Sequence, residues 1–318
     1  MGNNVISKHL YPLIMAALVG LVAMSGPTKA DSANPLQVKV FVSSEDHMGL
    51  GVASAIIYGE NEAVLVDAQF TVSNAHRLVA EILETGRELT TVYITHVHPD
   101  HFMGLPVIKQ AFPGARVVSI KASADDVNAS GDFKVEYWGK KILRHNGSKS
   151  TVFVETLQEP LITLEGNRLE ILGPFQGDAP NSSVVWIPSI KTLIASDLVF
   201  DHAHAWLSAA KSPALAQEWL TALDQLEALK PDVVVPGHAP SNGHLSPTSI
   251  AYTRQYIETF FEVLNKTDNS AELIAEMQRR YPDIALPFAL EYSAKILEDK
   301  WTWDGQWPES LRNLEVTH

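Results

Sequence analysis

Three histidines and one aspartate lie within six residues of this chain, and their spacing suits a metal centre. The segment follows an apolar stretch, residues 91–95, and reads His96-Val97-His98-Pro99-Asp100-His101. Because alternate residues of an extended backbone point the same way, His96 and His98 can bind one ion. A turn at Pro99 would place Asp100 and His101 under a second ion. A surface cluster of histidines is the alternative, but α/β proteins gather their sites at the carboxyl ends of strands, which favours metal binding.

The composition narrows the chemistry of such a site. The chain has 318 residues and no cysteine, so thiolate ligands, cysteine nucleophiles and disulfides are all excluded. Any metal must therefore be held by His, Asp, Glu or Gln side chains. With 46% hydrophobic and 19% charged residues, the composition is that of a globular protein.

Residues 1–30 have the pattern of an export signal. Lys8 lies in a polar start, residues 13–24 are apolar, and Thr28-Lys29-Ala30 forms a small-x-small cleavage site. The apolar run is well short of the ~20 residues that a membrane-spanning helix needs. We therefore predict cleavage after Ala30, a periplasmic or secreted location, and no membrane attachment of the mature chain.

The charge of the mature chain bears on its partners. Removing Lys8 and Lys29 with the signal leaves 22 of the 24 basic residues against 37 acidic ones. A strongly negative surface repels phosphate backbones and anionic lipids, which disfavours nucleic-acid and membrane partners. A small-molecule substrate remains compatible with it.

Strand and helix patterns alternate along residues 31–266. Strands are predicted at 38–43, 53–58, 63–66, 91–95, 115–120, 168–172, 183–187, 192–195 and 232–235. Helices are predicted after Ser73, before Phe112, and at Ser212-Pro213 and Ser246-Pro247. Residues 121–160 read as irregular, with room for a helix and a flap over the site. Two halves that each run from strands to helices predict an α/β domain, a four-layer αββα sandwich.

Residues 267–318 form a separate C-terminal extension in this interpretation. Asn269 with Glu272 has the pattern of a helix N-terminus, and Pro287 opens a second amphipathic helix. We expect this helical extension to pack on the core as structural cover. A lid or a dimer contact is the alternative.

The hexapeptide resembles the His-x-His-x-Asp-His signature of the metallo-β-lactamase-fold hydrolase superfamily, and the resemblance extends along most of the mature chain. It implies that Asp197, at the end of a strand, is a carboxylate shared by two metal ions. It also implies that His238 is the last imidazole ligand. Asp67 matches the acidic residue that supports the metal loop without binding the metal.

One ligand departs from the pattern of the superfamily. The family supplies a third imidazole to the first metal from a loop before an apolar strand. Here that loop reads Gly173-Pro174-Phe175-Gln176-Gly177-Asp178. We expect Gln176 to take the place of the imidazole. Because an amide oxygen binds zinc less strongly than imidazole, the site of His96 and His98 should be weakened.

Five other residues are candidates for the substrate pocket. His202 and His204 follow Asp197 closely, and either supplies a substitute imidazole, contacts substrate, or is an ordinary loop residue. His47, Trp138 and Trp206 could wall the pocket, with a surface or packing role as the alternative.

Zinc at this site would supply a hydroxide at neutral pH, since Zn²⁺ lowers the pKa of bound water to about 7. That hydroxide would attack a carbonyl carbon, with Asp100 orienting the nucleophile and moving its proton. The resemblance therefore implies hydrolysis of a lactone, ester, thioester or amide. One or two zinc ions are expected, and iron or manganese stays open because an iron dioxygenase branch shares much of the signature.

Two alternatives remain open. A β-lactamase is one, although the best-known members carry Cys or Ser where this chain has Asp197, and many carry Lys where it has Phe200. A non-catalytic metal-binding protein of the same fold is the other, with Gln176 as the sign of lost catalysis.

Overall fold

The computed structural model describes residues 1–2, 35–45, 48–241, 243 and 245–306. The chain divides into two units, residues 1–32 and 33–318, and every helix and strand among the described residues belongs to the second. The predicted signal peptide lies outside the described residues apart from its first two positions, and so does His47. Within the described ranges, no helix combines the length and apolar character needed to cross a bilayer.

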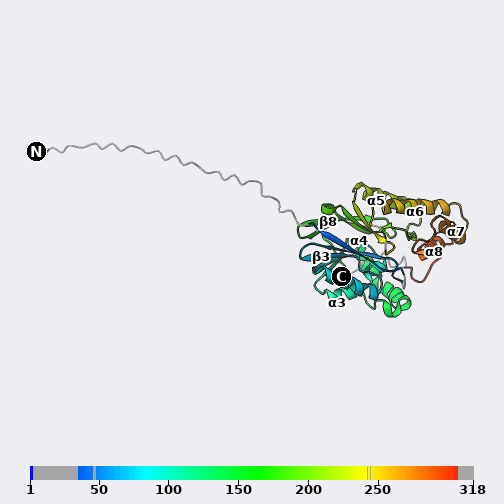
Figure 1. The fold of residues 1–318 in the computed structure, drawn as a ribbon, viewed down its shortest axis with the longest axis horizontal. Coiled ribbons are helices and arrows are strands. Elements are labelled where there is room, and N and C mark those ends of the chain that lie inside the picture. The colour runs from blue at the N-terminus through cyan, green and yellow to red at the C-terminus, as the bar shows by residue number, and fades with distance from the viewer. Residues whose placement is uncertain (3–34, 46–47, 242, 244, 307–318) are drawn as a thin grey trace. The chain divides into compact units, whose positions relative to one another are not determined.

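Two β-sheets lie face to face at the centre of this unit (Figure 1). The first sheet has the order β1-β2-β3-β4-β5-β6, antiparallel up to β3 and parallel from β3 onward. Its strands are Gln37–Val42, Ala53–Tyr58, Glu62–Val66, Glu88–Tyr93, Arg116–Ser119 and Glu155–Thr156. The second sheet has the order β11-β10-β9-β8-β7, parallel only between β10 and β11. From β7 to β11 its strands are Leu161–Leu164, Asn167–Phe175, Ser182–Ile187, Thr192–Phe200 and Val233–His238.

The interior between the sheets is built from β-branched and aliphatic side chains. Ile57 and Val64 of the first sheet belong to the same buried cluster as Leu169, Val185 and Ile194 of the second. These residues alternate along their strands because neighbouring side chains of a strand point to opposite faces. A second buried cluster joins the other faces of the sheets to the helices. The predicted αββα sandwich is therefore confirmed.

Helices cover the outer faces of the two sheets (Figure 1). The first sheet is covered by α1 (Val72–Thr85), α3 (Leu105–Ala111) and α4 (Lys121–Lys134). The second is covered by α5 (Pro213–Ala228) and α6 (Thr248–Leu264). The α1 N-cap is Thr71 rather than the predicted Ser73, and its hydroxyl accepts from the Asn74 amide. Ser212 caps α5 as predicted.

The segment predicted as irregular is largely helical in its first half. Helix α4 is followed by the π-helical turn η2 (Val135–Ile142) and the 3₁₀ turn η3 (Arg144–Asn146). Helix α4 is rich in Ser, Asp and Asn, which are weak helix formers, so its apolar periodicity is faint. Packing against β5 and β6 holds it in place.

The C-terminal extension forms α7 (Ser270–Arg280) and α8 (Pro287–Leu297). Asn269 caps α7 by accepting from the Glu272 amide at 3.0 Å. Leu273 and Leu290 are fully buried in the same core cluster as the helices of the sandwich. The Ser293 hydroxyl of α8 accepts from the Leu207 amide at 2.9 Å, so α8 is attached to the loop that follows β10.

Candidate metal centre

Chain segments from both sheets bring their polar residues to one edge of the sandwich. From the first sheet, Asp67 follows β3 directly and the hexapeptide follows β4. From the second sheet, Asp197 lies within β10 and His238 ends β11. Parallel strands share the edge at which their carboxyl ends lie, which explains why these distant residues meet.

The hexapeptide makes the turn that its proline predicts. Pro99 is the first residue of the short helix α2 (Pro99–Phe102), and the His101 amide donates to the His98 carbonyl at 3.2 Å. His98 is still extended, with φ −70° and ψ 140°. The His96 and His98 rings lie 4.9 Å apart between centroids, whereas Asp100 and His101 turn onto α2.

Two sets of metal-binding side chains converge at this edge. One potential ligand atom from each member of a set lies within 4.8 Å of the others. The first set is His96, His98, Asp178 and Asp197. The second set is Asp100, His101, Asp197 and His238. Asp197 is common to both, in the position expected of a bridging carboxylate.

The two oxygens of Asp197 reach imidazoles of both sets. Oδ2 lies 3.5 Å from His96 Nε2 and 3.2 Å from His238 Nε2. Oδ1 lies 3.1 Å from His101 Nε2. Gly237 permits this approach, because a Cβ at that position would overlap Asp197 Oδ1.

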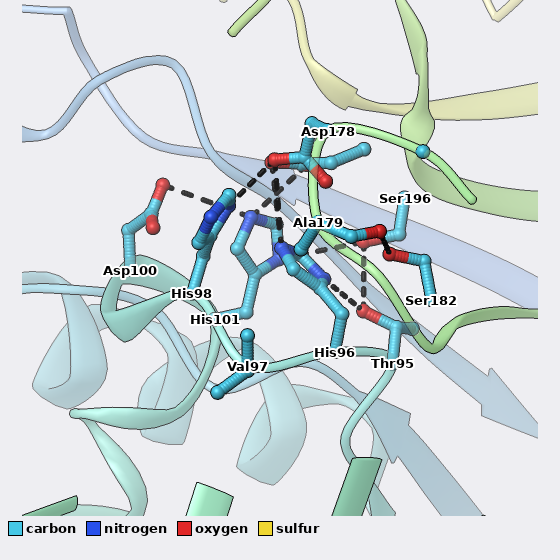
Figure 2. Close-up of polar contacts among 12 residues, drawn as sticks. Thr95, His96, Val97, His98, Asp100, His101, Asp178, Ala179, Ser182 and Ser196 are labelled. Atoms are coloured by element: carbon cyan, nitrogen blue, oxygen red, sulfur yellow. Dashed lines mark hydrogen bonds and ion pairs between the residues drawn. The ribbon is translucent and has the colours of Figure 1, made fainter. Parts of the chain in front are cut away.

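Each set also has a carboxylate of its own. Asp178 Oδ2 lies 2.5 Å from His98 Nδ1 and 3.9 Å from His96 Nε2 (Figure 2). In the second set, Asp100 Oδ2 lies 3.3 Å from His238 Nε2 and 3.7 Å from His101 Nε2.

Several atoms at the centre of this arrangement are buried without a hydrogen-bond partner among the described residues. They are His96 Nε2, His101 Nε2, Asp197 Oδ1 and both oxygens of Asp178. Asp178 Oδ2 is close to His98 Nδ1, yet the two do not meet in hydrogen-bond geometry. Unsatisfied buried nitrogen and oxygen atoms are costly, and divalent cations held by the two sets would give these atoms partners. The donor set therefore fits a divalent metal.

In three of these histidines, the other ring nitrogen contacts a polar atom outside the two sets. His96 Nδ1 lies 2.9 Å from Thr95 Oγ1, and His238 Nδ1 lies 2.8 Å from the Leu50 carbonyl oxygen. His101 Nδ1 lies 2.8 Å from Asp67 Oδ2. A hydrogen bond at one ring nitrogen orients the ring and leaves the other nitrogen free to bind metal.

Asp67 belongs to neither of the two sets, but with His96 and His101 it forms a third group of side chains that could hold a metal. Its carboxylate accepts from the Thr95 amide at 2.9 Å and from the Ser196 hydroxyl at 2.9 Å, besides contacting His101. It therefore links the hexapeptide to β10. This is the supporting position that the sequence resemblance implied for Asp67.

The acidic groups differ in their protonation. Burial raises the pKa of Asp197, but the imidazoles of His101 and His238 outweigh it and hold that pKa well below its ordinary range. Burial and the Asp197 carboxylate raise the pKa of Asp178 well above its ordinary range. A cation between Asp178 and Asp197 would remove this repulsion, since a bound ion dominates the charges around it.

The imidazoles also differ in their protonation. Burial lowers the pKa of His98 to about 4. Burial also lowers the pKa of His238, but Asp197 and Asp100 outweigh it and raise that pKa to about 10. Without a cation, the His238 imidazole is therefore protonated and lies beside the two carboxylates. The His98 imidazole is neutral, which is the form that binds metal.

The structure corrects the expected ligand Gln176. The Gln176 amide is half-buried and donates to the Gly177 carbonyl at 2.8 Å. Asp178, two residues later, is fully buried and is the side chain that reaches His96 and His98. A signal was available in the sequence, because a carboxylate is a common metal ligand and an amide is not. The predicted weakening of this set rested on Gln176 and loses its basis.

His202 and His204 contact tyrosines of helix α6. His204 is buried, with Nδ1 2.9 Å from the Tyr256 hydroxyl. The His202 side chain is 70% exposed, beside Asp201 and stacked on Tyr252. Neither histidine belongs to a group of possible metal ligands among the described residues. Their roles as substitute ligands or substrate contacts stay predictions.

Of the two predicted tryptophans, only Trp206 has a ring contact with a member of the ligand sets among the described residues. Trp206 approaches the His98 ring edge-on, with centroids 6.3 Å apart and an interplanar angle of 81°. Trp138 is half-buried and contacts Phe70 at 5.6 Å. Their role as pocket walls stays a prediction.

Residues 48–238 match the family model of the metallo-beta-lactamase superfamily, and the chain belongs to that superfamily. The match begins before β2 and ends at His238, so it includes every member of the two ligand sets.

Individual relatives are distant. A "Metallo-beta-lactamase type 2" of Pseudomonas aeruginosa is 22% identical over 218 residues, which cover 64% of this chain and 80% of that protein. A metallo-beta-lactamase family protein from Thermus thermophilus superposes with a TM-score of 0.58 at 19% identity, over 80% of this chain and 92% of its own. A beta-lactamase domain protein from Burkholderia ambifaria superposes with a TM-score of 0.59 at 16% identity, over 83% and 90%. The structural matches show the fold.

Replacing Asp178 should weaken metal binding, whereas replacing Gln176 should not. Asp178→Ala removes a buried carboxylate from the first set, so we expect the purified protein to lose about half of its bound divalent metal. Gln176→Ala is the matched control from the same loop and should retain the full amount. Elemental analysis after gel filtration measures both. Equal losses in the two variants would contradict the assignment of Asp178.

His204 should make the protein less stable in acid. Burial lowers the pKa of His204 to about 4, whereas an unfolded histidine titrates near 6.5. The unfolded state then binds the proton first, so this contribution is complete above about pH 6.5 and is lost as the pH falls towards 4. We expect a loss of up to about 3 kcal/mol in the free energy of unfolding.

Urea denaturation of His204→Gln at several pH values measures this effect. Its free energy of unfolding should depend less steeply on pH than that of the wild type between pH 6.5 and 4. His202→Gln, at the exposed neighbour, should keep the wild-type slope. An unchanged slope in His204→Gln would show that other groups cause the acid sensitivity.

Proposed function

We propose that this protein is an exported metal-dependent hydrolase that cleaves a lactone, ester, thioester or amide of a small molecule. The observation that carries the proposal is the convergence of two ligand sets on Asp197, with buried donor atoms that lack hydrogen-bond partners among the described residues. The superfamily, which consists mostly of metal-dependent hydrolases, supports the same reaction class.

The two sets would hold two divalent ions with similar donors. Each set has two imidazoles and one carboxylate of its own, and the two share Asp197. Zinc accepts such donors, and sets of two imidazoles with one carboxylate also suit iron(II), so iron and manganese remain candidates.

The bound ions would polarise the substrate carbonyl and lower the pKa of water to about 7. Asp100 is placed to orient that water, because its side chain is 12% exposed while its carboxylate contacts His238. Burial raises the pKa of Asp100, but His101 and His238 outweigh it and hold that pKa below its ordinary range. Asp100 is therefore ionised, can accept the proton of the attacking water, and can pass it to the leaving group.

The substrate reaches the centre from the side of His98 and Asp100. The His98 side chain is 23% exposed, whereas those of His96, His101 and Asp178 are fully buried. The scissile carbonyl must approach past these two residues.

A β-lactam is the alternative substrate, which the name of the Pseudomonas aeruginosa relative keeps open. Phe200 argues against a β-lactam substrate, because it occupies the position where many β-lactamases carry the lysine that binds the antibiotic carboxylate. Phe200 is buried and stacks on His238, with centroids 5.4 Å apart and an interplanar angle of 8°. This position offers no positive charge to a substrate carboxylate.

Hydrolysis should depend on metal and on Asp100. We expect chelation to abolish hydrolysis in a panel of lactones, thioesters, p-nitrophenyl esters and β-lactams, and zinc, manganese or iron(II) to restore it. Asp100→Asn should lower kcat by on the order of 10²–10⁴-fold, the usual contribution of a proton-transferring group. Asp125→Asn, at an exposed carboxylate paired with Lys121, is the control and should match the wild type.

The panel also separates the competing functions. Cleavage of β-lactams alone would favour the β-lactamase. Normal metal content with no cleavage of any class would favour the non-catalytic metal-binding protein and overturn the proposed hydrolase.

Export predicts a defined mature N-terminus. When the full chain is expressed in a Gram-negative host, we expect the protein in the periplasmic fraction or the medium, with Asp31 as its first residue. N-terminal sequencing or intact mass measures this directly. Replacing Leu18 and Val19 in the apolar run by Asp should keep the uncleaved chain inside the cell. Recovery of a full-length wild-type chain from the cytoplasm would contradict the proposed export.

A further inference from the structure

Aromatic side chains from three separate segments gather beside the candidate metal centre. One segment is η2, the second is the loop after β10, and the third is α8 with the residues that follow it. All six residues are half-buried, and we call them the aromatic cluster: Tyr137, Trp138, Trp206, Phe288, Tyr292 and Trp303.

Trp303 lies at the centre of the aromatic cluster. Its ring centroid is 5.6 Å from that of Trp138, 5.2 Å from Tyr292 and 6.3 Å from Trp206. Trp206 also contacts Phe288 at 6.1 Å. The contacts are tilted or edge-to-face, and they make one continuous apolar surface out of segments that are far apart in the chain.

The aromatic cluster meets the metal centre at its accessible side. Trp206 lies against the His98 ring, and His98 is the most exposed member of the two ligand sets. A substrate whose carbonyl passes His98 therefore places the rest of its structure beside Trp206.

The chain holds the segment after α8 against η2 by specific contacts. The Lys141 ammonium pairs with Asp304 at 3.0 Å and lies 5.2 Å from the centre of the Tyr137 ring. Gly305 packs directly on Tyr137, because a Cβ there would overlap an atom of that ring. The aromatic cluster is thus a built feature rather than an accidental contact of a chain end.

Half of the aromatic cluster lies outside the part of the chain that matches the family model. That match ends at residue 238, whereas Phe288, Tyr292 and Trp303 belong to the C-terminal extension. The extension therefore adds apolar surface to the accessible side of a centre that the rest of the superfamily domain builds.

We propose that the aromatic cluster binds a large apolar acyl group of the substrate, so that this hydrolase acts on esters, lactones or thioesters of hydrophobic acids. The inference rests on the proposed function. Half-buried aromatic rings beside a reactive centre gain free energy when an apolar group covers them. Because aromatic rings are largely apolar, selectivity should follow the apolar area of the acyl group.

A series of p-nitrophenyl esters tests the proposal with the metal-loaded wild type. From acetate to octanoate, kcat/KM should rise by about fourfold for each methylene that reaches the aromatic cluster. The ratio of octanoate to acetate should fall at least tenfold in Trp303→Ala and in Trp206→Ala. Trp303→Phe, which preserves an aromatic ring, should retain most of the ratio.

Two further variants serve as control and as independent test. Phe153→Ala removes an exposed aromatic side chain outside the aromatic cluster and should keep the wild-type ratio. Gly305→Val displaces the segment after α8 from Tyr137 without removing any ring, so it should lower the ratio even if an alanine variant folds poorly. Circular dichroism and thermal unfolding show which variants are folded.

Binding without hydrolysis separates this proposal from the proposed function. The compound p-nitrophenyl hexyl ether has no ester bond to hydrolyse, and its nitrophenyl group quenches tryptophan fluorescence. We expect saturable quenching in the wild type and at least tenfold weaker binding in Trp206→Ala.

Binding of the ether without hydrolysis of any ester would contradict the proposed hydrolase and support the apolar binding site. Hydrolysis with no dependence on chain length, together with no ether binding, would overturn the apolar site and leave the aromatic cluster as structural cover.

Discussion

The whole site depends on burying three carboxylates and four imidazoles in one small volume away from water. Asp100, Asp178 and Asp197 are all nearly inaccessible. Isolated buried charges are expensive, and partial pairing does not remove the cost. The surrounding structure fixes these groups at short range from one another, and positive charge between them would offset the repulsion of the carboxylates. A divalent cation bound between them would therefore stabilise the fold as well as the site.

The supporting residues show how this is achieved. Thr95 and Ser196 contact Asp67 and each other, so the loop after β4 and strand β10 are joined beneath the ligands. Trp219 of α5 donates from its indole to the Leu198 carbonyl at 3.0 Å, which fixes β10 one residue beyond Asp197. Strand pairing alone would not position these side chains. Hydrogen bonds from neighbouring elements set their orientation.

Much of the fold and most of the site could be predicted because their signals are local. Period-two apolar strands and helix caps such as Ser212 and Asn269 are visible in short windows, and the residues of the hexapeptide are adjacent in the chain. Residue type favours Asp178 over Gln176 as a metal ligand, but local patterns do not show which of the two side chains points inward. Which residue of a loop points inward depends on its path between β8 and β9, and that path is a property of the assembled sheet.

The aromatic cluster was beyond prediction for a similar reason. Trp138 and Trp206 stood out individually, but nothing in the sequence connects them to Trp303, which meets them only when α8 packs on the loop after β10. The prediction that His204 could be a substitute ligand rested on closeness in the chain alone. That residue is close to Asp197 in the chain, but its ring contacts Tyr256, and β10 continues past Asp197 before the chain reaches His204.

Because the ligands come from both sheets, an ion between them is also a cross-link. His96, His98 and His101 belong to one half of the sandwich, and Asp178, Asp197 and His238 to the other. Separating the halves would release the ion, so its binding energy opposes unfolding, by about 2.7 kcal/mol when the free ion stands at a hundred times its dissociation constant. Proteases attack opened chains, so the lifetime of a protein cross-linked in this way would follow the supply of trace metal in its surroundings.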